Sequence, residues 1–245
     1  LEHCKSALEA LISQKESRFY EALLPLGVYV AAYLNATEGT NYNVSKLFDW
    51  VFNGCQSSSG RTGWGIIVGK WGDYDVSGLQ GSITDGGGYA FLMNSIKPAW
   101  PFIPLVKYQP EYAKAIGKWM LNNSSACRLF YPGDIDEKHQ WAPELKNITN
   151  NHVSYEGLKK ADDYGKESLK GVSPVAIGDG PKWIEGNPAE SMFSVYSSSP
   201  VGILGAIITK TDVEGILQLD CNATDFYVDK PYPVYLYYNP YKEAK

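Results

Sequence analysis

Glycine is concentrated between residues 55 and 88, and this stretch limits what the chain can fold into more than any other. Glycine in the interior of a helix is destabilising, so a long regular helix is excluded here. A short strand is expected from Gly65 to Lys70, and the rest is predicted to be an ordered loop. Ordered loops of this length in compact domains are more often functional than not. The glycines of the stretch are Gly60, Gly63, Gly65, Gly69, Gly72, Gly78, Gly81, Gly86, Gly87 and Gly88.

Helical periodicity dominates the sequence before this stretch. Apolar residues recur at helical spacing over residues 5–34, and a break is expected near Pro25 because proline interrupts helix hydrogen bonding. A short amphipathic helix is predicted from Lys46 to Phe52, ended by Asn53-Gly54.

The sequence after the glycine stretch is expected to be helical in several pieces. One helix is predicted from about Tyr89 toward Pro98, and Pro110 at a first turn opens another. Residues 201–209 form a short apolar run, which is compatible with either a helix or a buried strand. Residues 212–219 are a further helix candidate. Residues 232–241 alternate Tyr, Pro and Val and are expected to be extended.

Composition is that of an ordinary globular protein, because 44% of the 245 residues are hydrophobic and 20% are charged. The length allows one large domain or two small ones. The net charge is −5 and Lys and Arg form no cluster, so no nucleic-acid partner is expected. No apolar run approaches the roughly 20 residues of a membrane span. Metal-ligand and phosphate-loop spacings are also missing, so no metal and no cofactor are expected.

Two features favour export to an oxidising compartment. The sequence contains six Asn-x-Ser/Thr sequons, and the overlap of Asn122 with Asn123 allows one glycan at that pair. An even number of widely spaced cysteines predicts two disulfides, with three pairings open, and four buried free thiols are the alternative. The sequon residues are Asn35, Asn43, Asn122, Asn123, Asn147 and Asn222, and the cysteines are Cys4, Cys55, Cys127 and Cys221.

Two segments carry a resemblance to a known family. The first is WGDYDVSGLQGS from Trp71 to Ser82, followed by DGGGYAF from Asp85 to Phe91. The second is PEYAKAIGKWMLN from Pro110 to Asn122, followed by Arg128-Leu-Phe-Tyr-Pro132. Together they resemble secreted proteins of the six-hairpin glycosidase type, mostly uncharacterised, over roughly residues 60–240.

The resemblance implies a fold class that is mainly α. It consists of helical hairpins of an (α/α)-toroid, complete or incomplete, with long glycine and aromatic loops and a short extended C-terminal segment. Residues 1–245 would form a single helical-hairpin domain. A full toroid of six hairpins needs a longer chain, so this one is expected to be part of a larger protein or to form fewer hairpins.

Carboxylates beside aromatic residues make the glycine stretch the expected site. Glycoside cleavage needs two carboxyl groups about 5 to 9.5 Å apart, and a sugar ring stacks on aromatic side chains. We therefore expect catalytic groups from the stretch and from the later Glu156. The catalytic candidates are Asp73, Asp75, Asp85 and Glu156, and the substrate-binding candidates are Trp71, Tyr74, Tyr89, His139 and Trp141.

Each candidate also has a plainer interpretation. Aspartates in glycine-rich loops commonly bond their own backbone, and Asp85 suits a helix N-cap. The Asp-x-Asp spacing also fits Ca²⁺, without a full EF-hand pattern. Glu156 suits the first turn of a helix, and His139 suits a charged surface loop.

The resulting hypothesis is a secreted, extracellular domain that acts on a poly- or oligosaccharide as a glycoside hydrolase or lyase. Two alternatives stay open. One is a non-catalytic glycan-binding module, and the other is a structural glycoprotein subunit of an extracellular assembly, in which the chain would form oligomers.

Overall fold

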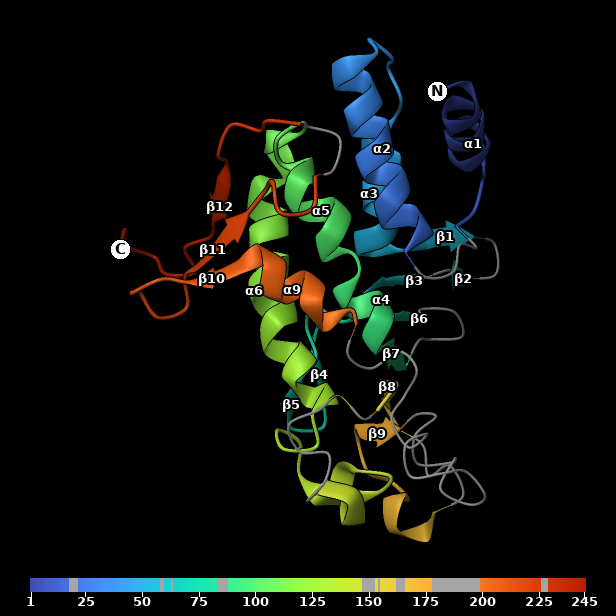
Figure 1. Cartoon of the computed structure of the whole chain (residues 1–245). Helices are drawn as coiled ribbons and strands as arrows, with labels where there is room; N and C mark the ends of the chain where they lie inside the picture. The colour runs from blue at the N-terminus through green and yellow to red at the C-terminus, as the bar shows by residue number, and fades with distance from the viewer. Residues whose placement is uncertain are drawn as a thin grey trace.

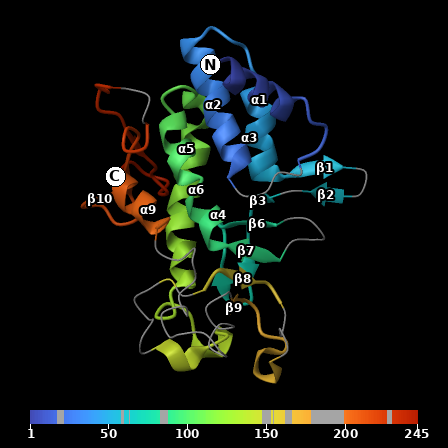
Figure 2. The ribbon, with the colours of Figure 1, turned by 45° about the vertical axis from the view of Figure 1, so that its right-hand side comes forward.

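The computed structural model shows a mixed α/β fold with a helical half and a sheet half (Figure 1). It describes residues 1–17, 22–57, 60–62, 64–82, 88–146, 153, 155–161, 166–177, 199–225 and 229–245. The expected toroid of helical hairpins is therefore wrong. The glycine stretch forms short antiparallel strands, and the helices gather in one group beside them instead of closing a ring (Figure 2).

The helical elements differ widely in length. The α-helices are α1 (Glu2–Ile12), α2 (Leu23–Thr37), α3 (Val44–Asn53), α4 (Leu92–Ile96), α5 (Ala99–Leu105), α6 (Ala113–Ala126) and α9 (Val201–Ile207). The 3-10 turns are η2 (Pro110–Tyr112), η3 (Cys127–Phe130), η4 (Glu137–His139), η5 (Pro143–Leu145) and η6 (Glu167–Leu169).

The described strands are short and pair antiparallel in four sheets with the orders β3-β6-β7-β8-β9, β10-β11-β12, β1-β2 and β4-β5. Those of the five-stranded sheet are β3 (Trp64–Ile66), β6 (Gln80–Ser82), β7 (Tyr89–Phe91), β8 (Gly157–Lys159) and β9 (Val175–Ile177). The others are β1 (Cys55–Ser57), β2 (Gly60–Thr62), β4 (Lys70–Trp71), β5 (Tyr74–Asp75), β10 (Ile208–Lys210), β11 (Leu217–Asp220) and β12 (Tyr235–Tyr237).

The helical half is built around α2, whose residues are apolar on nearly every side and which packs against α3 and α5. Helix α3 begins with a capping bond, because the Asn43 side chain accepts from the Lys46 backbone N–H at 3.0 Å. The Lys46 ammonium then donates to the carbonyls of Ile12 and Gln14 at the end of α1. One lysine on α3 thus holds the C-terminal end of α1 in place.

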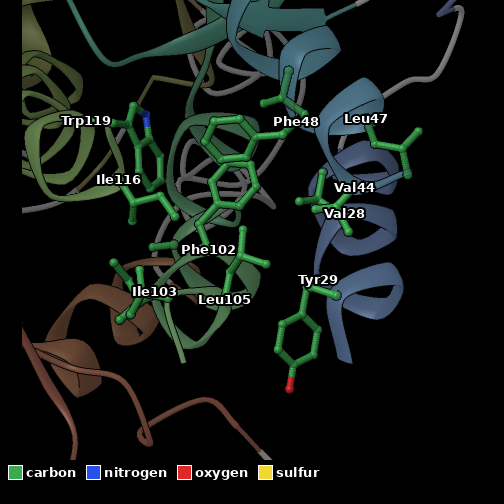
Figure 3. Close-up of a cluster of buried hydrophobic side chains, with 14 of the residues drawn as sticks. Val28, Tyr29, Val44, Leu47, Phe48, Phe102, Ile103, Leu105, Ile116 and Trp119 are labelled. Atoms are coloured by element: carbon green, nitrogen blue, oxygen red, sulfur yellow. The ribbon is translucent and has the colours of Figure 1, made fainter. Parts of the chain in front are cut away.

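Aromatic rings fill the centre of this half. Figure 3 shows Phe102 of α5 beside Phe48 of α3, and the two ring centroids are 5.8 Å apart. On its other side, Phe102 meets Trp119 of α6 edge to face at 5.5 Å. Edge-to-face and stacked ring pairs stabilise a core beyond the area they bury. Helices α3 and α6 are therefore joined through α5.

The sheet half has one face buried against a second apolar cluster. Ala90, Leu158 and Ala176 lie opposite one another on β7, β8 and β9, and all are buried in this cluster. Gly81 of β6 has no room for a side chain, since a Cβ there would lie 1.8 Å from the Tyr89 carbonyl oxygen. Glycine in this stretch therefore permits close strand pairing, which the expectation of a long loop missed.

Several expected elements are confirmed, among them the helix at residues 46–52, the helix after Pro110 and the strand within residues 232–241. Two early helices are also present, but α1 ends at Ile12 and α2 begins at Leu23, so Pro25 lies in the first turn of α2 and not at the expected break. The apolar residues 201–209 are helix first and strand second. The helix expected over residues 212–219 is wrong, because Gly215 adopts a positive φ of 74° and Leu217 begins a paired strand. None of the helices within the described ranges is both long enough and apolar enough to span a membrane.

A buried charge network joins the C-terminal segment to the helical half. The Asp225 carboxylate accepts from the hydroxyls of Tyr29 at 2.7 Å and Tyr108 at 2.6 Å, and it pairs with Lys107 at 2.5 Å. Burial alone would raise the pKa of Asp225. The bonds from Lys107 and the two tyrosines, together with the Lys107 charge, outweigh burial and hold this pKa below its ordinary value.

We predict that Asp225→Asn lowers the free energy of unfolding by about 3 kcal/mol, because it leaves the largely buried Lys107 without its counter-charge. A lowered pKa in the folded state stabilises above the unfolded pKa and is lost as the pH falls through the folded value. Urea titrations between pH 7 and pH 2 should therefore show a loss of stability below about pH 4 in the wild type that the variant lacks. The control is Asp212→Asn, which removes an exposed carboxylate; an acid dependence equal in Asp225→Asn and wild type would contradict the prediction.

Candidate functional site

Asp73 and Asp75 of the glycine stretch lie on the β4–β5 hairpin, and Asp75 makes the contacts of a turn. Asp73 is exposed in the turn, whereas Trp71 is buried in the second apolar cluster. Asp75 accepts from the Ser77 backbone N–H at 2.9 Å. Hydrogen bonds from the side chain and the backbone of Ser77 lower the pKa of Asp75. These bonds of Asp75 to its own loop match the turn interpretation. Asp85 lies outside the described residues.

Tyr74 and His139 are brought together, but as parts of a packed contact. Their rings meet edge to face at 4.9 Å, and the Tyr74 hydroxyl accepts from the Asp136 backbone N–H at 3.1 Å. His139 is buried, and its Nδ1 lies 2.7 Å from the Pro174 carbonyl oxygen. That oxygen is an acceptor, so Nδ1 carries the proton and the ring is held in one orientation. The expectation of a surface histidine is wrong.

Tyr89 and Glu156 form a second contact, in which the Tyr89 hydroxyl donates to the Glu156 carboxylate at 3.0 Å. Glu156 directly precedes strand β8, so it does not lie in the expected first turn of a helix. Trp141 lies apart from this contact, with the Lys166 ammonium 4.8 Å above its ring. The Tyr74–His139 and Tyr89–Glu156 contacts share no residue. The structure thus brings the sequence candidates together in pairs, and neither pair joins two carboxylates.

The cysteines do not form the expected disulfides among the residues described. Cys4 is an exposed free thiol on α1, while Cys127 and Cys221 are buried free thiols. The Cys127 thiol donates to the Asn123 side-chain oxygen at 3.6 Å. Burial raises the pKa of Cys221 to about 12 and also raises that of Cys127. The fourth cysteine, Cys55, has its side chain outside the described part, so the correction applies to the other three.

We predict that iodoacetamide labels Cys4 in the native protein but labels Cys127 and Cys221 only after unfolding. The thiolate is the reactive form, and burial both blocks access to these two thiols and disfavours their ionisation. Peptide mapping by mass spectrometry with and without urea would measure this. A native peptide in which any two of these three cysteines are linked would contradict it.

The sequon asparagines differ in how their amide groups are used. The Nδ2 of Asn35 donates to the Tyr42 carbonyl, and that of Asn222 donates to the Tyr232 carbonyl. Asn123 is fully buried, with Nδ2 bonded to the carbonyls of Gly78 and Ser95. Asn43 is exposed and Asn122 is half-buried, whereas Asn147 lies outside the described residues. Of the overlapping pair, Asn122 is therefore the more accessible acceptor.

Two neighbouring hollows that share Phe52 lie along α3 and α6, and we call the two together the groove. Their volumes are about 360 and 440 Å³, within the range of ligand pockets. We call them the α6 hollow and the α3 hollow. The α6 hollow is lined by Phe52, Ile66, Val68, Ser77, Gly78, Ala115, Lys118, Trp119 and Asn122. The α3 hollow is lined by Asn43, Ser45, Lys46, Phe48, Asp49, Phe52, Asn53 and Tyr112.

The α3 hollow has stacked aromatic rings beneath a polar rim. Phe48 stacks on Phe52 with centroids 4.5 Å apart and on Tyr112 with centroids 4.0 Å apart. Burial, followed by the negative charges of Glu111 and Asp49, raises the pKa of Tyr112. The Tyr112 hydroxyl therefore stays protonated and can donate a hydrogen bond at neutral pH.

The α6 hollow is shaped by a loop that two side chains of α6 hold. The Gly78 carbonyl accepts from Trp119 Nε1 and from Asn123 Nδ2, both at 2.9 Å. Gly78 has a positive φ of 93°, and a Cβ there would lie 2.6 Å from the Asn123 backbone nitrogen. Glycine is therefore needed at this position. The loop that carries Ser77 and Gly78 becomes one wall of the hollow, and α6 becomes the other.

Sequence reasoning missed the groove, although part of its signal is in the sequence. Ala115, Lys118 and Asn122 stand at i, i+3 and i+7 on α6, which places them on one face of a helix. Trp119 is core, as the helical periodicity indicated, but it also lies at the floor of the α6 hollow. The pairing of α6 with α3 across α5 is a tertiary relation that no local pattern shows.

Comparison of the chain with protein-family models, with curated proteins and with solved structures found no match. Within the described ranges, no three His, Cys, Asp or Glu side chains gather in a way that would hold a metal ion.

We predict that Asn123→Ala lowers the free energy of unfolding by about 2 kcal/mol, because the buried Ser95 carbonyl loses its bond from Nδ2 and the Gly78 carbonyl loses one of its two donors. Urea denaturation followed by tryptophan fluorescence would measure the change. The matched control is Asn122→Ala, one residue earlier and half-buried, which should change stability by less than about 0.5 kcal/mol. Equal effects of the two substitutions would contradict this role of Asn123.

Proposed function

We propose that the protein is a carbohydrate-binding domain that holds a sugar chain in the groove along α3 and α6. The observation that supports this best is the lining of the groove, in which aromatic rings lie between hydroxyl, amide and charged side chains. A sugar ring has an apolar face that packs on an aromatic ring and a rim of hydroxyls that bond to polar groups. The groove offers both kinds of contact at once.

The arrangement of Phe52 favours a chain over a single sugar. Phe52 is half-buried and belongs to both hollows, so a ligand that lies across its ring reaches the α3 hollow on one side and the α6 hollow on the other. Its stacking on Phe48 and its contact with Phe102 at 5.8 Å fix the position of this ring. A ring held in place before binding loses little conformational freedom when the ligand arrives.

The described lining of the groove has too few carboxylates for hydrolysis, which favours sugar binding over cleavage. Glycoside cleavage needs two carboxyl groups on opposite sides of the scissile bond. Among the described residues that line the groove, Asp49 is the one carboxylate. It also accepts from the Asn53 side chain on the next turn of α3. We therefore favour the glycan-binding alternative over the glycoside hydrolase or lyase.

An extracellular location is part of this proposal. The six sequons are its support. The cysteines described give the proposal no support, because they are free.

We predict that Ala115→Trp abolishes sugar binding or weakens it by at least about tenfold, which corresponds to 1.4 kcal/mol. Ala115 is exposed and lines the α6 hollow, so an indole there fills the hollow without disturbing the core. Titration calorimetry with neutral and acidic oligosaccharides of plant, fungal and bacterial polysaccharides would measure the affinities.

The matched control is Lys114→Trp, which places the same indole one residue earlier on an exposed position outside the lining. It should bind as the wild type does, and both variants should unfold at the wild-type temperature. A wild type that binds none of these sugars, or an Ala115→Trp variant that binds as well as Lys114→Trp, would overturn the proposal.

A further inference from the structure

The two polar side chains that α6 presents to the α6 hollow, Lys118 and Asn122, have no partner among the residues that the structure describes. Lys118 is exposed and Asn122 is half-buried, and both line the hollow. Neither side chain has a hydrogen bond or an ion pair with any part of the chain that the structure describes. They are four residues apart on one helix, so they are neighbours on its surface. An ammonium group and an amide N–H₂ therefore stand side by side with their donors unused.

The charge of this hollow is one-sided. Lys118 is the one charged residue among the described residues of its lining. Asp75, two residues before Ser77 of the lining, accepts from the Ser77 backbone N–H and lies near Lys70. Asp49 belongs to the α3 hollow, beyond Phe52, and is bonded to Asn53. The described lining thus brings a positive charge into the α6 hollow without a matching negative one.

The apolar side chains of the lining strengthen the electrostatic interactions of Lys118 relative to those of a lysine on an open surface. Trp119 and Phe52 form part of the lining and exclude water from one side of the hollow. An ion pair formed there is screened less than one in bulk solvent. Hydrogen bonds to a charged group are also stronger than those between neutral groups. A bound anion would receive donors from Lys118 and Asn122, which a neutral hydroxyl cannot use to the same extent.

We propose that the α6 hollow binds the carboxylate of an acidic sugar, so that the natural ligand is a uronate-containing oligosaccharide rather than a neutral one. The Lys118 ammonium and the Asn122 amide donate to the carboxylate oxygens, and the sugar ring packs toward Trp119 and Phe52. The next sugar units continue across Phe52 into the α3 hollow. This inference rests on the proposed carbohydrate-binding function.

The test is titration calorimetry with oligomers of galacturonate, glucuronate and mannuronate, each measured beside its carboxyl-reduced, neutral form. We expect at least one acidic oligomer to bind about tenfold more tightly than its reduced form. Lys118→Gln should bring the affinity of that acidic oligomer down to that of the reduced form. Lys118→Arg keeps the charge and should retain most of the affinity, and added salt should weaken the binding of the acidic oligomer alone.

Lys114→Gln is the matched control, because it removes an exposed lysine charge from the same helix outside the hollow. Equal binding of acidic and reduced oligomers, blocked by Ala115→Trp, would overturn the acidic-sugar inference and leave the carbohydrate-binding function standing. An equal loss of affinity in Lys114→Gln and Lys118→Gln would overturn the role of Lys118. If neither acidic nor neutral oligomers bind the wild type, both proposals fall.

Discussion

The side chain of Phe102 sets the geometry on which the groove depends. It is fully buried in α5, and its ring lies between Phe48 and Trp119 (Figure 3). The ring also pairs with that of Phe52. The Phe102 ring and the direct stacking of Phe48 on Tyr112 together set how far apart α3 and α6 lie. A smaller side chain would let the two helices approach and would narrow the groove, while a larger one would not fit a core packed at the density of a protein interior. The hollows above this ring are a consequence of core packing.

The loop around Gly78 connects this helical core to the sheet half. It follows the β4–β5 hairpin and leads directly into β6, and its carbonyl is bonded by two side chains of α6. The wall of the α6 hollow is thus attached to the same helix that supplies Lys118 and Asn122. A binding site whose two walls are joined by buried hydrogen bonds keeps its shape before the ligand arrives. The aromatic floor and the donor pair are then held at a fixed separation.

The sequence predicted local structure better than it predicted the arrangement of the parts. Helical periodicity located α2 and α3, and Pro110 marked the start of η2 and α6, because these signals depend on residues close together in the chain. The prediction of a long loop in the glycine stretch is wrong, because glycine occurs both in loops and in closely paired strands. The strand with which Gly81 pairs is set by the tertiary fold and not by neighbouring residues. For the same reason the candidate site could be predicted only in part. Tyr89 and Glu156 do meet, yet the groove depends on α3 and α6 meeting across α5.

The Asp225 network has a consequence for the order in which the molecule is assembled. The bond from Tyr29 to Asp225 joins residues 196 apart in the chain, so it cannot form on the ribosome until most of the protein has been made. Until then, the seam between α2 and α5 that receives Asp225 presents an ammonium group and two phenol hydroxyls to water. Such groups are well hydrated, and a waiting seam of this kind attracts other nascent chains less than an apolar one would. Because the network is completed last, the unfinished protein exposes hydrated polar groups at this seam and not an apolar surface that would favour aggregation.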